Sequence, residues 1–184
     1  MTCPLSRDDA LALLAAHIKT DYTIRHSLAT EAVLRGLARR LGHDEDLWGL
    51  AGLLHDLDLE DVGGDPDRHA RETAALLAGL GCPAAMTDAI LAHNGDRLGI
   101  PCRTPLDFAL CAGESVTGLV FAMALVLPSK AVADVKPKSV QKRIREPRFA
   151  ANVSRERVGQ HRGLGLEEDE FLAIAVAAMQ EAGV

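Results

Sequence analysis

The sequence LLHDLD, residues 53–58, carries the strongest signal for both fold and chemistry. It ends an apolar run that begins near Asp44 and carries leucines at positions 47, 50, 53 and 54, the spacing of one helix face. Gly42 precedes this run and indicates the end of an earlier helix. The acidic, glycine-containing residues 57–66 predict a loop after it. The adjacent pair His55-Asp56 is therefore expected at the C-terminal end of an apolar helix, directly before a loop.

Further histidines and a carboxylate accompany this pair along the chain. His26 precedes it, and His69, His93 and Glu114 follow it. Imidazole and carboxylate together suit divalent first-row metals. An aspartate next to a histidine can bridge two ions while the histidine binds one, so the pattern predicts a metal centre with two ions. Such a centre lowers the pKa of water from about 16 to about 7 in the best case and can hold an attacking and a leaving oxygen.

The composition favours helices. Hydrophobic residues make up 48% of the 184 residues and aromatic residues only 3%, with alanine and leucine dominant. This mixture favours helices packed through small aliphatic faces over a β-sandwich. The length suits one domain, 1–184, with a substantial core. No segment has a convincing strand pattern, so we predict an all-α bundle of seven or more helices.

Capping and breaking residues set the expected helix boundaries. Ser6 followed by Asp9 resembles a capping box, Gly81 predicts a stop, and Pro83 and Pro105 predict starts. The expected helices cover residues 6–18, 24–41, 44–56, 68–80, 83–94, 105–125 and 167–181. Each candidate ligand then comes from a different helix, mostly near its end. Convergence of such ends around one pocket is how helical bundles hold metals.

Charge and cysteine usage argue against several classes of partner. The net charge of −6 comes with no wide basic face, which argues against a nucleic-acid polymer. The longest apolar stretch, residues 116–127, is too short to span a bilayer. The four cysteines share no CxxC spacing and no signal peptide is evident, so we expect reduced thiols in a cytoplasmic protein. A homodimer through an Ala/Leu helix face is compatible with the sequence.

Four local strings carry a family resemblance: RHS at 25–27, LLHDLD at 53–58, AILAHN at 89–94 and TGL at 117–119. In this order the chain resembles the HD superfamily of metal-dependent phosphohydrolases. Residues 128–140 also resemble the tail of small bacterial HD-domain proteins. The resemblance covers about residues 11–179 and implies an HD-domain-like helical bundle. It is specific to the superfamily and to no one substrate.

The resemblance implies a ligand set. His26, His55 and Asp56 would bind a first metal together with the carboxylate on the helix that begins at Pro105. Asp56 would bridge to a second metal, which His69 and His93 would also bind. The family's ligand on the Pro105 helix is normally aspartate, whereas this chain has Glu114. Glutamate is one methylene longer, so it would ligate from a helix set slightly further back or hold the first metal weakly.

Further residues are weaker candidates. Asp58 could orient a metal-bound water or act as a general base, although an exposed loop acid is the plainer interpretation. Arg25, Lys130 and Lys136 could contact substrate phosphates, the arginine through two nitrogens and the lysines as point charges, with Lys138 a further possibility. A solvated run of charges is the alternative for all of them.

These observations lead to a main hypothesis and two alternatives. The main hypothesis is a phosphohydrolase acting on a small phosphorylated molecule or nucleotide through Asp56, Asp58 and two divalent metal ions. Iron, manganese, cobalt, nickel and zinc are all compatible with the ligands. The first alternative is a di-iron oxygenase, whose ligand set overlaps. The second is a regulatory module without catalysis, in which Glu114 marks the decay of the centre.

Overall fold

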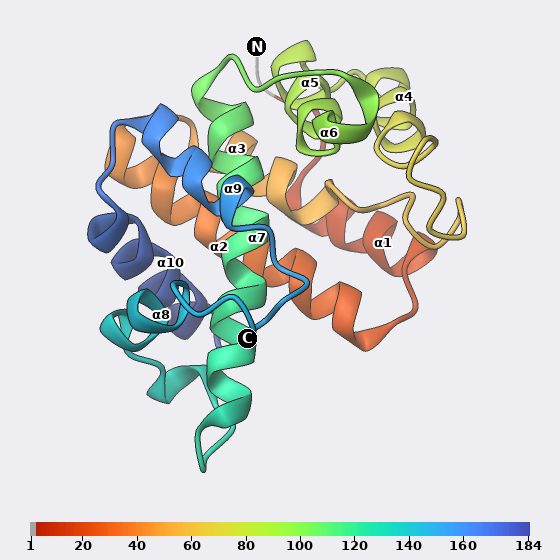
Figure 1. Ribbon diagram of the computed structural model, residues 1–184. Coiled ribbons are helices and arrows are strands. Elements are labelled where there is room, and N and C mark those ends of the chain that lie inside the picture. Colours follow the sequence, from red (N-terminus) through yellow and green to blue (C-terminus); the bar gives the residue numbers. More distant parts are fainter. Residues whose placement is uncertain (1–2) are drawn as a thin grey trace.

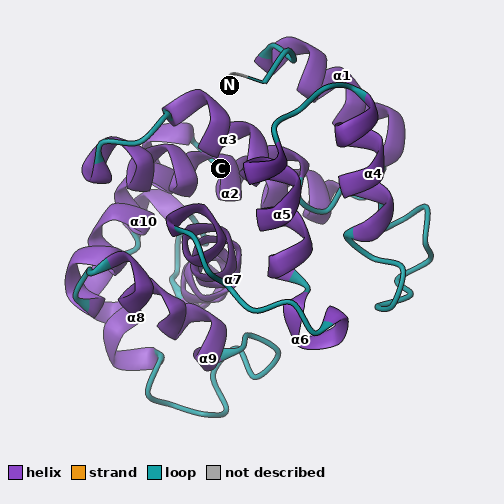
Figure 2. Ribbon diagram, turned by 90° about the horizontal axis from the view of Figure 1, so that it is seen from above, coloured by secondary structure: helices purple, strands orange, loops and turns teal. Residues whose placement is uncertain are grey.

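A computed structural model describes residues 3–184, and every regular element in that range is helical (Figures 1 and 2). The predicted all-α fold is therefore confirmed. The elements are α1 (Arg7–His17), α2 (Asp21–Leu41), α3 (Glu45–Leu54), α4 (Arg71–Gly79), α5 (Ala84–His93), α6 (Gly95–Leu98), α7 (Pro105–Val126), η1 (Val132–Asp134), α8 (Pro137–Arg143), α9 (Arg155–Val158), η2 (Gly159–Leu164) and α10 (Glu168–Ala182).

Helix α7 is the central helix of the bundle. It contacts α2, α3, α5 and α10, and Figure 1 shows it running through the middle of the molecule. Helices α4, α5 and α6 lie toward one end, and α8 and α10 lie on the other side of α7. Helix α7 has the length and hydropathy of a membrane-spanning helix, yet 67% of its most apolar window is buried inside the fold, as in a core helix.

Local capping explains where several helices begin. Ser6 and Asp9 form the predicted capping box of α1, and Thr104 and Asp107 form a second one at the start of α7. The Asp44 side chain accepts hydrogen bonds from two backbone amides of α3. Gly42 ends α2 in the left-handed conformation, with φ of 74°. Each of these helix ends is determined by residues that lie within a few positions of it in the sequence.

Gly52 allows α3 to lie directly against α2. A Cβ atom at this position would lie 2.8 Å from the Thr30 carbonyl oxygen and 2.9 Å from the Glu31 amide nitrogen. Both atoms belong to backbone, which cannot move aside easily. The glycine therefore sets the separation of the two helices that carry His26 and His55.

The predicted boundaries need four corrections. Helix α2 begins at Asp21, three residues earlier than expected, and α4 begins at Arg71 instead of Arg68. His69 consequently lies in the turn before α4 and does not open the helix. The stretch 95–98 is a short helix, where a loop was expected. Residues 128–166, for which no helix is expected from the sequence, contain α8, α9 and two 3-10 helices.

The cysteines lie in two pairs of free thiols. The Sγ atoms of Cys3 and Cys82 are 2.8 Å apart, and those of Cys102 and Cys111 are 3.0 Å apart. Cys3 and Cys82 lie in loops 79 positions apart, and Cys102 lies in the loop before α7, which contains Cys111, so sequence spacing gave no indication of either pair.

Candidate metal centre

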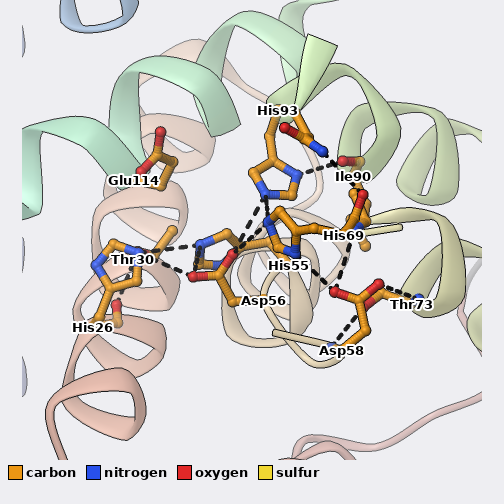
Figure 3. Close-up of polar contacts among 12 residues, drawn as sticks. His26, Thr30, His55, Asp56, Asp58, His69, Thr73, Ile90, His93 and Glu114 are labelled. Atoms are coloured by element: carbon orange, nitrogen blue, oxygen red, sulfur yellow. Dashed lines mark hydrogen bonds and ion pairs between the residues drawn. The ribbon is translucent and has the colours of Figure 1, made fainter. Parts of the chain in front are cut away.

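Asp56 lies at the centre of four histidine side chains (Figure 3). Its Oδ2 atom is 3.7 Å from His26 Nε2 and 3.3 Å from His55 Nε2. Its Oδ1 atom is 3.3 Å from His69 Nε2 and 3.4 Å from His93 Nε2. Each carboxylate oxygen thus faces its own pair of imidazoles.

The two imidazole pairs are equally close-set. The Nε2 atoms of His26 and His55 are 3.2 Å apart, and those of His69 and His93 are 3.1 Å apart. Asp56 with either pair forms a group whose ligand atoms all lie within 4.8 Å of one another. Each of the two groups could hold a metal ion, and they share Asp56.

Backbone carbonyls orient two of the histidines. The Nδ1 atom of His55 donates to the Gly52 carbonyl oxygen at 2.8 Å, and that of His93 donates to the carbonyl of Ile90. A carbonyl oxygen can only accept, so the ring proton must sit on Nδ1. Nε2 is therefore the ring nitrogen that faces Asp56, and a histidine that binds metal through Nε2 needs its proton on Nδ1 in this way.

A hydroxyl and a carboxylate orient the other two. The Thr117 hydroxyl donates to the carbonyl oxygen of Glu114 at 2.7 Å and so accepts from Nδ1 of His26 at 2.9 Å. Nδ1 of His69 donates to Asp58 Oδ1 at 2.8 Å. All four histidines therefore have Nδ1 engaged in a hydrogen bond and direct Nε2 at one carboxylate, and a set of four Nε2 atoms around a carboxylate fits a divalent metal.

Burial and mutual charge perturb the acid–base equilibria of the cluster. Burial lowers the pKa of His26 and lowers that of His93 to about 4. At His69 burial acts in the same direction, but hydrogen bonds with Asp56 and Asp58 outweigh it and raise the pKa to about 9. Burial opposes ionisation of Asp56, yet His55 and the other imidazoles hold its pKa well below the usual range. Asp56 is therefore a carboxylate throughout the physiological pH range.

Asp58 supports His69 through a hydrogen bond. It is buried, and its oxygens also accept from the backbone amides of Ala70 at 3.2 Å and Thr73 at 2.9 Å. Ala70 adopts the left-handed conformation, with φ of 71°, which directs its amide toward Asp58. These contacts describe a positioning residue for His69, and the role as a general base stays a prediction.

Glu114 lies beside the cluster without joining either group. Its Oε1 atom is 2.7 Å from Nη2 of Arg157 and accepts a hydrogen bond from the Ser115 hydroxyl at 2.6 Å. Figure 3 draws Glu114 on α7, apart from the four imidazoles. Its role as a metal ligand stays a prediction, since in this structure the carboxylate is engaged by Arg157.

The three predicted phosphate-binding residues fall in two places. Arg25 and Lys130 line a cavity of about 180 Å³ together with Tyr22 and Phe121. Tyr22 also lines a cavity of about 240 Å³ over His26 and Glu114, so these two cavities adjoin. Lys136 lines a separate groove beside α8 and α10.

Sequence reasoning missed Thr117 and Arg157 as members of the site. Thr117 lies three residues after Glu114 and therefore on the same face of α7, a spacing that could have indicated it. Arg157 lies in α9, far along the chain from any predicted ligand. No local pattern in the sequence distinguishes it from the other arginines nearby.

Comparison with known proteins agrees with this geometry. A family model of the HD domain matches residues 23–126, more than half of the chain, and these residues contain all four histidines and both aspartates described above. The searches of curated proteins and of solved structures gave no match. HD domains bind divalent metals and are typical of metal-dependent phosphohydrolases. The chain belongs to the HD-domain family.

Proposed function

We propose that this protein is a metal-dependent phosphohydrolase that cleaves a small phosphate ester or nucleotide at a centre of two divalent transition metal ions. One observation carries the proposal: the two oxygens of Asp56 face two separate pairs of Nε2 atoms. A single ion would need only one such pair with one oxygen. The second, equally oriented pair supports a second ion with Asp56 as the shared ligand.

Metal ions bound here would lower the pKa of a water molecule and neutralise charge on the phosphoryl group. The chain's own contribution is to fix the ligands. Asp58 and Thr117 hold His69 and His26, and the carbonyls of Gly52 and Ile90 hold the other two histidines. Preorganised ligands need no rearrangement when substrate binds.

The cavity over His26 offers the substrate a route to the centre. It is lined by Tyr22, Ser115, Asn152 and Arg157 in addition to His26, and it measures about 240 Å³. The adjoining cavity with Arg25 and Lys130 would accept the part of the substrate that does not react. Tyr22 is 62% exposed and lines both spaces, so it is placed to contact either portion.

Hydrolysis of a panel of phosphate monoesters and nucleotides tests the proposal. Metal-replete wild-type protein should release phosphate from at least one member, and Asp56→Asn and His55→Ala should abolish the release. His43→Ala is a matched control, because His43 stacks on Trp48 and lies outside both ligand groups.

Three outcomes would contradict the proposal. Failure of the protein to hydrolyse any of these phosphate esters and nucleotides, with metal bound at both positions, would contradict phosphohydrolase activity. Tightly bound iron with oxygen uptake would favour the oxygenase alternative, and no bound metal at all would favour a regulatory module. The small phosphorylated substrate, the cytoplasmic location, the homodimer and the lack of nucleic-acid or membrane partners stay predictions.

A further inference from the structure

An ion pair closes one wall of the candidate centre. Nη2 of Arg157 lies 2.7 Å from Oε1 of Glu114, and the two side chains are 26% and 16% exposed. Nη2 also donates to the carbonyl oxygen of His93. The guanidinium thus connects the backbone of a candidate ligand on α5 with a carboxylate on α7.

Arg157 also borders open space on two sides. It lines the cavity over His26, where Ser115, Asn152 and Ser154 supply further hydrogen-bonding groups. It lines a second cavity of about 370 Å³ that reaches His93. Arg157 is therefore accessible to a small anion that enters toward the centre. It lies outside residues 23–126, which the HD-domain model matches.

The chain holds α9 firmly in this position. Arg155, two residues before Arg157, donates to the backbone carbonyls of Glu146, Phe149, Ala150 and Val153. These contacts fix the loop that brings Asn152 and Ser154 over the cavity. Gly118 on α7 permits the close approach, because a Cβ atom there would lie 2.8 Å from Val153 Cγ2.

Glu114 differs from the other candidate ligands in how it is held. Its backbone carbonyl accepts a hydrogen bond from the Thr117 hydroxyl, which in turn contacts His26. Its carboxylate is held separately, by Arg157 and by the Ser115 hydroxyl. The carboxylate can therefore turn without disturbing His26. An anion with several oxygens can replace a carboxylate on a guanidinium, because both accept the same forked pair of N–H groups.

We propose that Arg157 binds the phosphoryl oxygens of the substrate and that Glu114 occupies this anion-binding position until substrate arrives. The inference rests on the proposed function and identifies the ligand as a phosphate group. Binding of the phosphate exchanges one anion for another on Arg157 and releases the Glu114 carboxylate, which can then turn toward the side of Asp56 that faces His26. Phosphate and Glu114 compete for one guanidinium.

Binding of inorganic phosphate to the chain of 184 residues, measured by calorimetry, tests this competition in a double-mutant cycle. Arg157→Gln should weaken phosphate binding roughly tenfold or more, the effect expected for a charged hydrogen-bond donor. Glu114→Gln should tighten phosphate binding several-fold by freeing the guanidinium. In the double variant, Glu114→Gln should have little effect. Arg145→Gln is the matched control, since Arg145 pairs with Glu168 at 3.7 Å on the surface.

Additivity decides the outcome. If Glu114→Gln tightens phosphate binding equally with and without Arg157, the two residues act only through their net charge and the competition is wrong. Unchanged phosphate binding in Arg157→Gln would also overturn the proposal. If that variant fails to fold by circular dichroism, Arg157→Lys replaces it, and it should weaken binding several-fold because the fork is lost while the charge remains.

The same measurements separate this inference from the proposed function, because phosphate binding requires no turnover. A non-additive cycle in a protein that hydrolyses none of the phosphate esters would leave the anion site standing and refute the phosphohydrolase. An additive cycle in an active phosphohydrolase would refute only the competition between Glu114 and phosphate.

Discussion

The two sides of Asp56 differ in how completely the chain has built them. On the Oδ1 side, His69 is held by the buried carboxylate of Asp58, and the Asn94 side chain fixes the preceding turn by donating to the carbonyls of Pro66 and His69. On the Oδ2 side, His26 is held by the hydroxyl of Thr117. The further carboxylate on that side, Glu114, is paired with Arg157.

This difference indicates two kinds of metal position. On the Oδ1 side, the carboxylate of Asp58 already holds His69. On the Oδ2 side, the carboxylate of Glu114 is paired with Arg157 and does not pair with a histidine side chain in the part of the chain that the structure describes. A carboxylate behind a histidine increases the basicity of the ligand more than a hydroxyl does. We therefore expect the Oδ1 side to bind metal more tightly in the absence of substrate.

The largest expected effect is at the residue that both sides share. Asp56→Asn removes the negative charge between the four imidazoles, so we expect loss of metal from both positions and no detectable hydrolysis. Elemental analysis of the purified variant measures this directly. Retention of the wild-type metal content would show that Asp56 is not the shared ligand.

The next largest effect separates the two sides. His69→Ala should lower the metal content from about two ions to about one, and His26→Ala should do the same from the other side. Titration with a chelator should remove the remaining ion more easily from His69→Ala than from His26→Ala, because the better supported side is lost in the former. Easier removal of the remaining ion from His26→Ala would mean that the Oδ2 side binds metal more tightly.

A smaller effect is expected from the supporting residues. Asp58→Asn should weaken metal binding by about 10–100-fold, the usual range for a partner of a ligating histidine. Thr117→Val should weaken it less, since it removes a neutral hydrogen bond. Competition with a metal-sensitive dye gives both affinities, and thermal unfolding checks that each variant is folded. Equal losses would mean that the two supports do not differ.

The smallest effect concerns the cations outside the centre. Arg25→Ala and Lys130→Ala should raise KM several-fold with little change in kcat, because they border the cavity that adjoins the centre at Tyr22. Lys136→Ala should leave both constants unchanged, since Lys136 lines a separate groove. A KM increase in Lys136→Ala alone would place the substrate elsewhere.

Short-range signals explain why much of the fold could be predicted. The caps at Ser6, Asp44 and Thr104 and the stop at Gly42 act within a few residues, so the helices that they bound are close to expectation. The turn before α4 could not be predicted in this way. Asp58 accepts from the amide of Ala70 and favours its left-handed backbone, which delays the helix to Arg71.

The same distinction applies to the candidate centre. The histidines and Asp56 could be predicted because their types and order carry the chemistry of metal binding. Arg157 could not, because its importance depends on the packing of α9 against α7, which brings together residues 43 positions apart. The ion pair of Glu114 with Arg157 depends on the same packing, so it could not be predicted from the sequence either.

Anomalous diffraction at the absorption edge of the bound metal would locate the ions around Asp56. We expect two peaks in crystals of the metal-loaded protein, one between Asp56 Oδ2 and the His26–His55 pair and one between Oδ1 and the His69–His93 pair. A single peak shared by all four histidines, or no peak at Asp56, would show that Asp56 is not the shared ligand of two ions.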